Sequence, residues 1–146
     1  MNNSEKIFLG SDHGGFELKE KIKKYLDDKG YCIEDLGCYS EESVDYPEFG
    51  RKVALAVVEN KARGIIVCGT GIGISMAANK VKGARAGLCH SVEYAKLTRQ
   101  HNDANVLSMG GRFIDHELAI EVTDTFLNTE FEGGRHQKRV DDIDNV

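Results

Sequence analysis

Residues 65–75 combine a cysteine with three closely spaced glycines. An apolar, β-branched run ends at Cys68, glycine then occupies the next three odd-numbered positions, and a helical pattern follows over 74–80. A buried strand that enters a glycine-rich turn at the start of a helix directs several backbone N–H groups toward one point. Such a point attracts an anion. The stretch therefore predicts an anion site with a thiol at its rim.

The glycine loop differs from two common phosphate-binding fingerprints. A dinucleotide fingerprint needs G-x-G-x-x-G after the first strand and an acid about 20 residues further on. Here position 74 is Ile, the loop follows the third predicted strand, and His90 and Ser91 stand near the place of the acid. The P-loop pattern G-x-x-x-x-G-K-[ST] is absent. A tight turn that serves packing alone remains an alternative, although one turn does not require three glycines.

Cys68 has two interpretations. Cysteine is more often a small buried hydrophobic residue than a base or a nucleophile. Ionising half of an ordinary thiol at neutral pH takes about 2 kcal/mol, and a helix N-terminus supplies at most about that much. A thiolate at this position therefore needs further hydrogen-bond donors or desolvation by a substrate.

Four polar residues at predicted element ends are further candidates, each with a structural alternative. Asp12 and His13 follow the first predicted strand and could be a helix N-cap and a surface histidine. His101 and Asn102 could close a helix as a C-cap with a favourable charge, which would also explain Arg99.

The C-terminal tail carries two arginines four positions apart. If the tail is helical, Arg135 and Arg139 share one face, where they form either a fork for phosphate or a solvated basic surface. His90, His116 and His136 have no spacing that recommends them as metal ligands, and the motif H-E-x-x-H does not occur. We therefore expect no metal site.

Composition narrows the class of protein. The 146 residues carry a net charge of −5, from 19 Lys+Arg and 24 Asp+Glu, which disfavours a nucleic-acid or anionic-membrane surface. Apolar runs are too short to span a bilayer, and residues 1–6 lack a signal-peptide layout. The cysteines, with no C-x-x-C pair, fit free thiols in a reducing cytoplasm. They are Cys32, Cys38, Cys68 and Cys89. One proline and no low-complexity tract predict a single domain over 1–146.

Apolar runs alternate with amphipathic segments along the chain. Predicted strands cover 6–11, 31–35, 64–68, 84–89 and 105–109. Predicted helices cover 16–29, a segment that Pro47 opens, 74–80, a segment from Ser91 to about 103, and 115–127. Alternation with short loops indicates a parallel sheet covered on both faces. The predicted fold is a three-layer, doubly wound α/β domain of Rossmann or flavodoxin type with five strands.

In such sheets, ligands bind beyond the carboxyl ends of the strands. Asp12 and His13 follow strand one, the loop 68–73 follows strand three, and Arg112 follows strand five, so all three groups are expected at one edge. His101 and Asn102 end a helix, which predicts the opposite edge. A partner subunit that supplies them would resolve this mismatch.

Several motifs in order make the chain similar to type B ribose-5-phosphate isomerases, in the family that includes galactose- and allose-6-phosphate isomerases. They are G-S-D-H-G-G-F at 10–16, D-Y-P at 45–47, C-G-T-G-I-G-I-S at 68–75, A-A-N-K at 77–80, R-Q-H-N-D-A-N-V at 99–106 and G-G-R-H-Q-K-R-V at 133–140. One branch of the family uses a glutamate near position 72 in place of the cysteine. This chain has Ile72 and retains Cys68, so it resembles the cysteine branch.

The resemblance implies interconversion of D-ribose 5-phosphate and D-ribulose 5-phosphate, a step of the pentose phosphate pathway, through an enediolate. Cys68 would be the base for the carbon-bound proton. Thr70 would handle the hydroxyl proton, and His101, assisted by Asp12, would open the sugar ring. The enediolate would be held by the N–H groups of Gly69, Thr70, Gly71, Ile72 and Gly73, so that neither a metal nor another cofactor is needed.

The resemblance also implies how substrate and subunits come together. The phosphate would be bound by His13, Arg112, Arg135 and Arg139, and Asn102 would contact the sugar. Active sites of this family form between the subunits of a homodimer, with a tetramer as a further possibility. The tail 128–146 would then be able to reach a partner subunit.

Two alternatives to a pentose-phosphate isomerase remain open. The same residues could isomerise allose 6-phosphate, galactose 6-phosphate or a tetrose phosphate, because pocket depth decides the length of the sugar. A non-catalytic phosphosugar-binding module is the second alternative. The joint presence of Cys68, Thr70 and His101 argues against it, because binding alone requires none of them.

Overall fold

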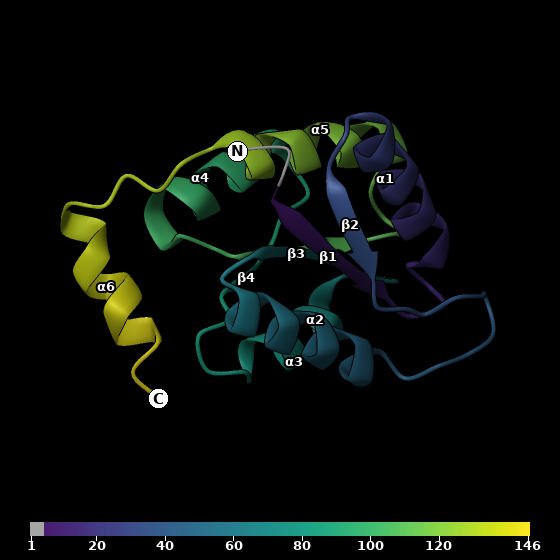
Figure 1. Cartoon of the computed structure of the whole chain (residues 1–146), viewed down its shortest axis with the longest axis horizontal. Helices are drawn as coiled ribbons and strands as arrows, with labels where there is room; N and C mark the ends of the chain where they lie inside the picture. The colour runs from purple at the N-terminus through teal and green to yellow at the C-terminus, as the bar shows by residue number, and fades with distance from the viewer. Residues whose placement is uncertain (1–4) are drawn as a thin grey trace.

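The computed structural model describes residues 5–146, in which parallel strands alternate with helices (Figure 1). The strands are β1 (Lys6–Ser11), β2 (Cys32–Asp35), β3 (Arg63–Cys68), β4 (Ala86–Leu88) and β5 (Val106–Gly110). The helices are α1 (Phe16–Asp28), α2 (Tyr46–Asn60), α3 (Ile72–Asn79), α4 (Val92–Asn102), α5 (His116–Asn128) and α6 (Arg135–Ile143). The strand order is β2-β1-β3-β5-β4, all parallel, which confirms the predicted doubly wound α/β fold.

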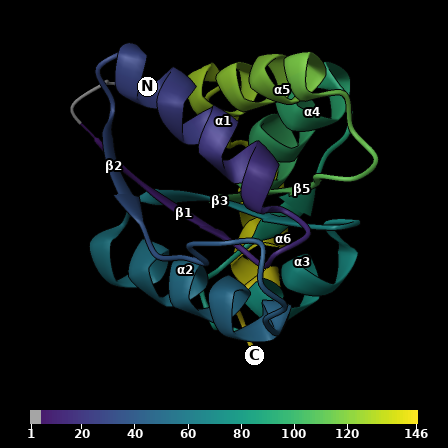
Figure 2. The ribbon, with the colours of Figure 1, turned by 90° about the vertical axis from the view of Figure 1, so that its right-hand side faces the viewer.

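The sheet separates two hydrophobic layers because successive strand residues point to opposite faces. On one face, Ile7 and Leu9 of β1 pack with buried residues of α1, α4 and α5. On the other face, Phe8 packs with buried residues of α2 and α3. Figure 2 shows these helix layers above and below the sheet. The two-sided burial explains why β1, β3 and β5 are almost continuously apolar.

Two predicted boundaries are wrong by a few residues. Helix α3 begins at Ile72 rather than at residue 74, because Gly71, with φ of 78°, already ends the loop as the N-cap residue. Strand β4 spans only Ala86–Leu88, although residues 84–89 were expected to be extended. By contrast, Ser91 caps α4 as predicted, since its hydroxyl accepts the N–H of Tyr94 at 3.1 Å.

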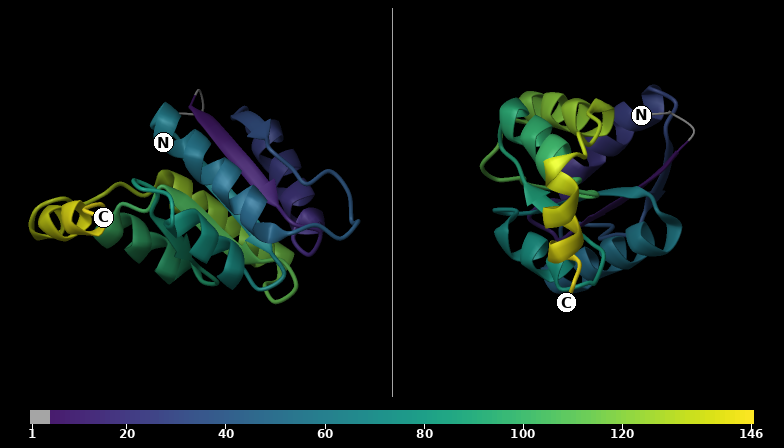
Figure 3. Two further views of the ribbon diagram at one scale, coloured as in Figure 1. Left: turned by 90° about the horizontal axis from the view of Figure 1, so that it is seen from below. Right: turned by 90° about the vertical axis from the view of Figure 1, so that its left-hand side faces the viewer.

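Helix α6 lies outside the two layers, in the C-terminal tail, which is helical as the shared face of Arg135 and Arg139 requires. It packs on α4, and Figure 3 shows it across the end of the molecule where the strands begin, running from the α4–α5 layer toward the α2–α3 layer. The carboxyl ends of the strands lie at the opposite end (Figure 1). No helix within residues 5–146 is long and apolar enough to cross a bilayer.

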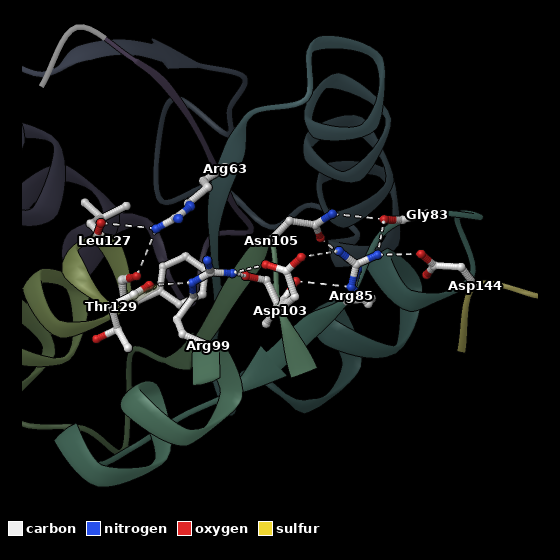
Figure 4. A network of polar contacts seen from close by, with 11 residues as sticks. Arg63, Gly83, Arg85, Arg99, Asp103, Asn105, Leu127, Thr129 and Asp144 are labelled. Atoms are coloured by element: carbon white, nitrogen blue, oxygen red, sulfur yellow. Dashed lines mark hydrogen bonds and ion pairs between the residues drawn. The ribbon is translucent and has the colours of Figure 1, made fainter. Parts of the chain in front are cut away.

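A polar network fixes the end of α4 beside the amino ends of the strands (Figure 4). Arg99, only 4% exposed, donates to the Asp103 carboxylate at 2.8 Å and to the Ala104 carbonyl at 2.7 Å. Arg85 donates to the Asp103 carbonyl at 3.1 Å and pairs with Asp144 at 2.6 Å. The last turn of α4 and the end of α6 are therefore held to the same part of the sheet.

Candidate active site

The thiol of Cys68 lies at the turn between β3 and α3. Its sulfur accepts the backbone N–H of Gly71 at 3.1 Å, and the residue is 5% exposed. The carbonyl of Gly71 in turn accepts the hydroxyl of Ser108, on β5, at 2.7 Å. The turn is thus fixed from both sides, and it presents a hydrogen-bond donor to the sulfur. A sulfur anion accepts such a bond more strongly than a neutral thiol does.

Some backbone N–H groups of the loop donate hydrogen bonds within the loop, and others have no acceptor. Gly71 donates to the Cys68 sulfur, and Ile72 donates to the Thr70 hydroxyl at 3.1 Å. The N–H groups of Gly69 and Thr70 in the turn, and of Gly73 and Ile74 in the first turn of α3, meet no acceptor among residues 5–146. Orphan donors of this kind bind anions at helix N-termini. Open donors of this kind therefore lie both in the glycine turn and at the start of α3.

Asp12 and His13 lie in the turn between β1 and α1. The Asp12 carboxylate accepts the N–H of Gly15 at 3.1 Å, and the Asp12 N–H donates to Val67 of β3 at 3.2 Å. Gly15, rather than Asp12, is the N-cap residue of α1. His13 accepts the N–H of Val44 through Nδ1 at 3.1 Å, so its other ring nitrogen carries the proton when the ring is neutral.

Arg112 follows β5 and reaches the same turn. Its N–H donates to the Gly69 carbonyl at 3.1 Å. Glycine at position 14 permits a close approach, because a Cβ there would lie 3.1 Å from the Gly69 nitrogen and 3.3 Å from the Arg112 guanidinium carbon. The three loops that follow β1, β3 and β5 therefore meet at one edge, as the sheet topology requires.

The other four predicted site residues lie at the opposite end of the molecule. His101 and Asn102 occupy the last turn of α4, and Arg135 and Arg139 lie on α6. The ring of His101 stacks on that of His136, with centroids 4.4 Å apart. Burial, together with the charges of His101 and Arg135, lowers the pKa of His136. Within one chain the structure brings these residues together with each other, but not with Cys68.

Three residues near the first group were not singled out as site residues from the sequence. Tyr46 covers the start of α3, since a Cβ on Gly73 would lie 2.8 Å from its hydroxyl oxygen. His90 accepts the N–H of Gly110 at 3.0 Å, and Ser108 holds the Gly71 carbonyl. The motif D-Y-P contained a signal for Tyr46. No spacing in the sequence connects positions 90 or 108 with the loop.

The chain closely resembles known proteins over nearly its whole length. The Ribose/Galactose Isomerase family model matches residues 7–143. Ribose-5-phosphate isomerase B of Escherichia coli is 48% identical over 140 residues, which are 95% of this chain and 94% of that protein.

Solved structures give the same result. A ribose 5-phosphate isomerase from Thermotoga maritima is 53% identical with a TM-score of 0.95, covering 97% of this chain and 99% of that one. Ribose-5-phosphate isomerase B from Mycoplasma genitalium, with bound ribulose-5-phosphate, is 46% identical with a TM-score of 0.92, covering 96% and 94%. The resemblance inferred from the motifs is confirmed, and the chain belongs to the Ribose/Galactose Isomerase family.

Proposed function

We propose that this protein interconverts D-ribose 5-phosphate and D-ribulose 5-phosphate. Its relatives from Escherichia coli and Mycoplasma genitalium carry the name ribose-5-phosphate isomerase B, and the second is known with ribulose-5-phosphate bound. The observation that carries the proposal is the Cys68 sulfur, which accepts the Gly71 N–H directly beside the open amides of α3. A base next to an anion site is what proton transfer through an enediolate requires.

In the proposed reaction, His101 donates a proton to the ring oxygen of the sugar as its bond to C1 breaks, and Asp12 assists by accepting the proton of the C1 hydroxyl. Cys68 then removes the proton from C2 of the open chain, and the electron pair moves onto the carbonyl oxygen to give the enediolate. Thr70 transfers the hydroxyl proton between O1 and O2, and Cys68 returns its proton to C1. Because the enediolate charge develops only after proton abstraction, the open amides of Gly69, Thr70 and Gly73 favour the transition state over the substrate.

Phosphate binding would hold the open chain in register with Cys68. We assign the phosphate to His13, Arg112, Arg135 and Arg139, and a sugar hydroxyl to Asn102. A charged group bound far from the reacting carbons contributes through positioning, which lowers the entropic cost of the reaction. The arginines suit this role because they pair with phosphate oxygens in a bidentate manner.

We infer that the complete site forms between two copies of the chain. The assigned residues lie at opposite ends of one chain, so a single copy would offer two half-sites. An exposed apolar surface favours association beside the loop. Ile72 and Met76 of α3 are 48% and 63% exposed, and Leu88 on the edge strand β4 is 36% exposed. We further propose that the protein works in the cytoplasm, in the pentose phosphate pathway. Its four free cysteines suit a reducing compartment.

The test is kcat/KM for ribose 5-phosphate beside allose 6-phosphate and galactose 6-phosphate. A clear preference for the pentose is expected. A preference for a hexose would keep the proton-transfer chemistry and reject the substrate. Binding without turnover of any of the three would favour a phosphosugar-binding module instead.

A further inference from the structure

Two histidines and a glutamate converge where α4 meets α6. His101 comes from the last turn of α4, Glu132 from the segment before α6, and His136 from the first turn of α6. One ligand atom from each lies within 4.8 Å of the others. His136 Nε2 lies 3.6 Å from a Glu132 carboxylate oxygen. None of the polar contacts that shape the Cys68 loop involves these three side chains.

The backbone holds this cluster in place. The Glu132 N–H donates to the Gln100 carbonyl, next to His101, at 3.1 Å, and the His136 N–H donates to the Gly133 carbonyl at 3.0 Å. His136 is 8% exposed, whereas the Glu132 side chain is 51% exposed. The cluster therefore has an anchored imidazole and a carboxylate that is free to adjust from the solvent side.

We propose that His101, Glu132 and His136 bind a divalent transition-metal ion, with Zn²⁺ preferred and water completing the coordination. Two imidazoles and a carboxylate form a ligand set that suits Zn²⁺ and does not suit Mg²⁺. Tetrahedral Zn²⁺ with ligands at about 2.0–2.1 Å keeps its donor atoms about 3.4 Å apart. The 3.6 Å contact already meets that spacing. The His101 ligand nitrogen lies within 4.8 Å of the other two ligand atoms. A tilt of the His101 ring out of its stack on His136 brings this nitrogen to the spacing that Zn²⁺ requires.

Metal binding at this cluster has a consequence that rests on the proposed function. A His101 nitrogen bound to Zn²⁺ cannot donate the proton that opens the sugar ring. The ion would therefore inhibit turnover of the cyclic sugar, and the isomerisation itself would still proceed without a metal. The existence of the metal site does not depend on that role of His101.

The experiment measures Zn²⁺ affinity of the full chain by competition with a chromophoric chelator, in a Cys32→Ser background that removes the exposed thiol. Glu132→Gln and His136→Asn should each weaken binding at least roughly tenfold, as loss of a metal-site partner does. Glu130→Gln is the matched control, because it removes the same charge from the same segment. It should bind like the parent. Cobalt substitution should give visible absorption bands that shift in the His136→Asn variant, and Mg²⁺ should not compete.

Three outcomes would overturn the metal site: no binding at micromolar Zn²⁺, equal binding by Glu132→Gln and the parent, or loss of binding in Cys68→Ala with Glu132→Gln unaffected. The last would identify the loop thiol as the ligand. Zn²⁺ inhibition that is relieved in Glu132→Gln supports both the site and its consequence. Binding that follows the proposal but leaves turnover unchanged would retain the metal site and reject the ring-opening role of His101.

Discussion

Cys68 differs from the other cysteines in what surrounds its sulfur. It receives the Gly71 N–H at 3.1 Å, beside the start of a helix. Cys89 is 1% exposed, and burial raises the pKa of its thiol to about 12, which keeps that thiol protonated at neutral pH. Cys38 donates to the Ser40 carbonyl at 3.3 Å, and Cys32 is exposed. Of these four thiols, Cys68 alone accepts a backbone N–H at the start of a helix.

The first prediction concerns this thiol. Cys68→Ala should lower kcat by about 10²–10⁴-fold, the usual contribution of a general acid–base group, while phosphosugar affinity changes little. Steady-state kinetics and calorimetric binding of ribose 5-phosphate measure the two effects separately. Cys89→Ala is the matched control and should retain kcat. Normal turnover by the Cys68→Ala protein would reject the assignment of the base.

The Cys68 loop was partly predictable from the sequence. A cysteine before alternating glycines, at a strand–helix junction, was sufficient to predict a thiol beside open backbone amides. The sequence did not reveal that the Gly71 and Ile72 amides are engaged within the loop, because that depends on side-chain rotamers of Cys68 and Thr70. Nor could it bring Glu132 toward His101, since their contact follows from how α6 packs on α4.

Among elements, a buried ion pair orders the loop that carries Asp12. Lys19, 1% exposed on α1, bonds the Asp35 carboxylate at the end of β2 at 2.6 Å. The same carboxylate accepts the Gly37 N–H at 2.9 Å, and the Gly37 carbonyl accepts the Ser11 N–H at 2.6 Å. Asp12 is the next residue in the chain. The position of Asp12 thus depends on contacts that link α1, β1 and β2.

The second prediction follows from this ion pair. Asp35→Asn should lower the free energy of unfolding by about 3 kcal/mol at pH 7, because it leaves the Lys19 ammonium buried without its main partner. Urea unfolding at pH 7 measures the change. Lys23→Ala is the control. Lys23 also bonds Asp35, at 3.0 Å, but its side chain is 43% exposed, so the loss should stay below about 1 kcal/mol. Equal losses in the two variants would contradict the role of burial.

The third prediction concerns how the difference in unfolding free energy between wild type and Asp35→Asn depends on pH. Burial acts to raise the pKa of Asp35, but the hydrogen bonds from Lys19, Gly37 and Lys23 outweigh it and leave the pKa lowered. A lowered pKa stabilises the fold fully above the ordinary value of about 3.9, and this stabilisation is lost as pH falls through the folded-state value. The stability gap between wild type and Asp35→Asn should therefore be constant from pH 5 to 7 and narrow in acid. A stability difference that increases in acid would contradict a lowered pKa of Asp35.

A fourth prediction tests the Ser91 cap at the start of α4. Ser91→Ala should destabilise the protein by about 1 kcal/mol, because the Tyr94 N–H loses the acceptor that caps α4. Ser91→Asp, which keeps an acceptor, should retain most of the stability in the same thermal unfolding experiment. If both variants lose the same amount, the side chain contributes through something other than capping.

Helix caps and strand periodicity depend on neighbouring residues, so they could be predicted from the sequence. The start of α3 and the length of β4 depend on contacts that are distant in sequence, so they could not. The fold class followed from the alternation of buried runs and amphipathic segments. The early start of α3 depends on the positive φ of Gly71, and Gly71 is packed against Leu88 of β4 and Met109 of β5, which are distant in sequence. Strand β4 is short because it lies at the edge of the sheet, and no pattern in the sequence around residues 84–89 indicates that position.

At the scale of the whole molecule, the assigned residues divide into two groups at opposite ends of the sheet. The loops after β1, β3 and β5 carry Asp12, Cys68 and Arg112, and the junction of α4 and α6 carries His101 and Arg135. The sequence predicted this separation for His101, because it ends a helix. It could not place the arginines, whose position depends on the docking of α6. Either the second group has no part in catalysis, or two chains combine their halves.

A complementation experiment with two inactive variants tests whether two chains combine their half-sites. Cys68→Ala and His101→Asn should each be nearly inactive alone, because each damages every site. When the two are unfolded together and refolded at equal concentration, random pairing makes half of the dimers mixed, and each mixed dimer holds one intact site and one doubly damaged site. Activity should therefore recover to about a quarter of the wild-type value if the halves come from different chains. Refolding each variant alone is the control. If Cys68 and His101 act within one chain, mixed dimers contain no intact site, and no activity returns.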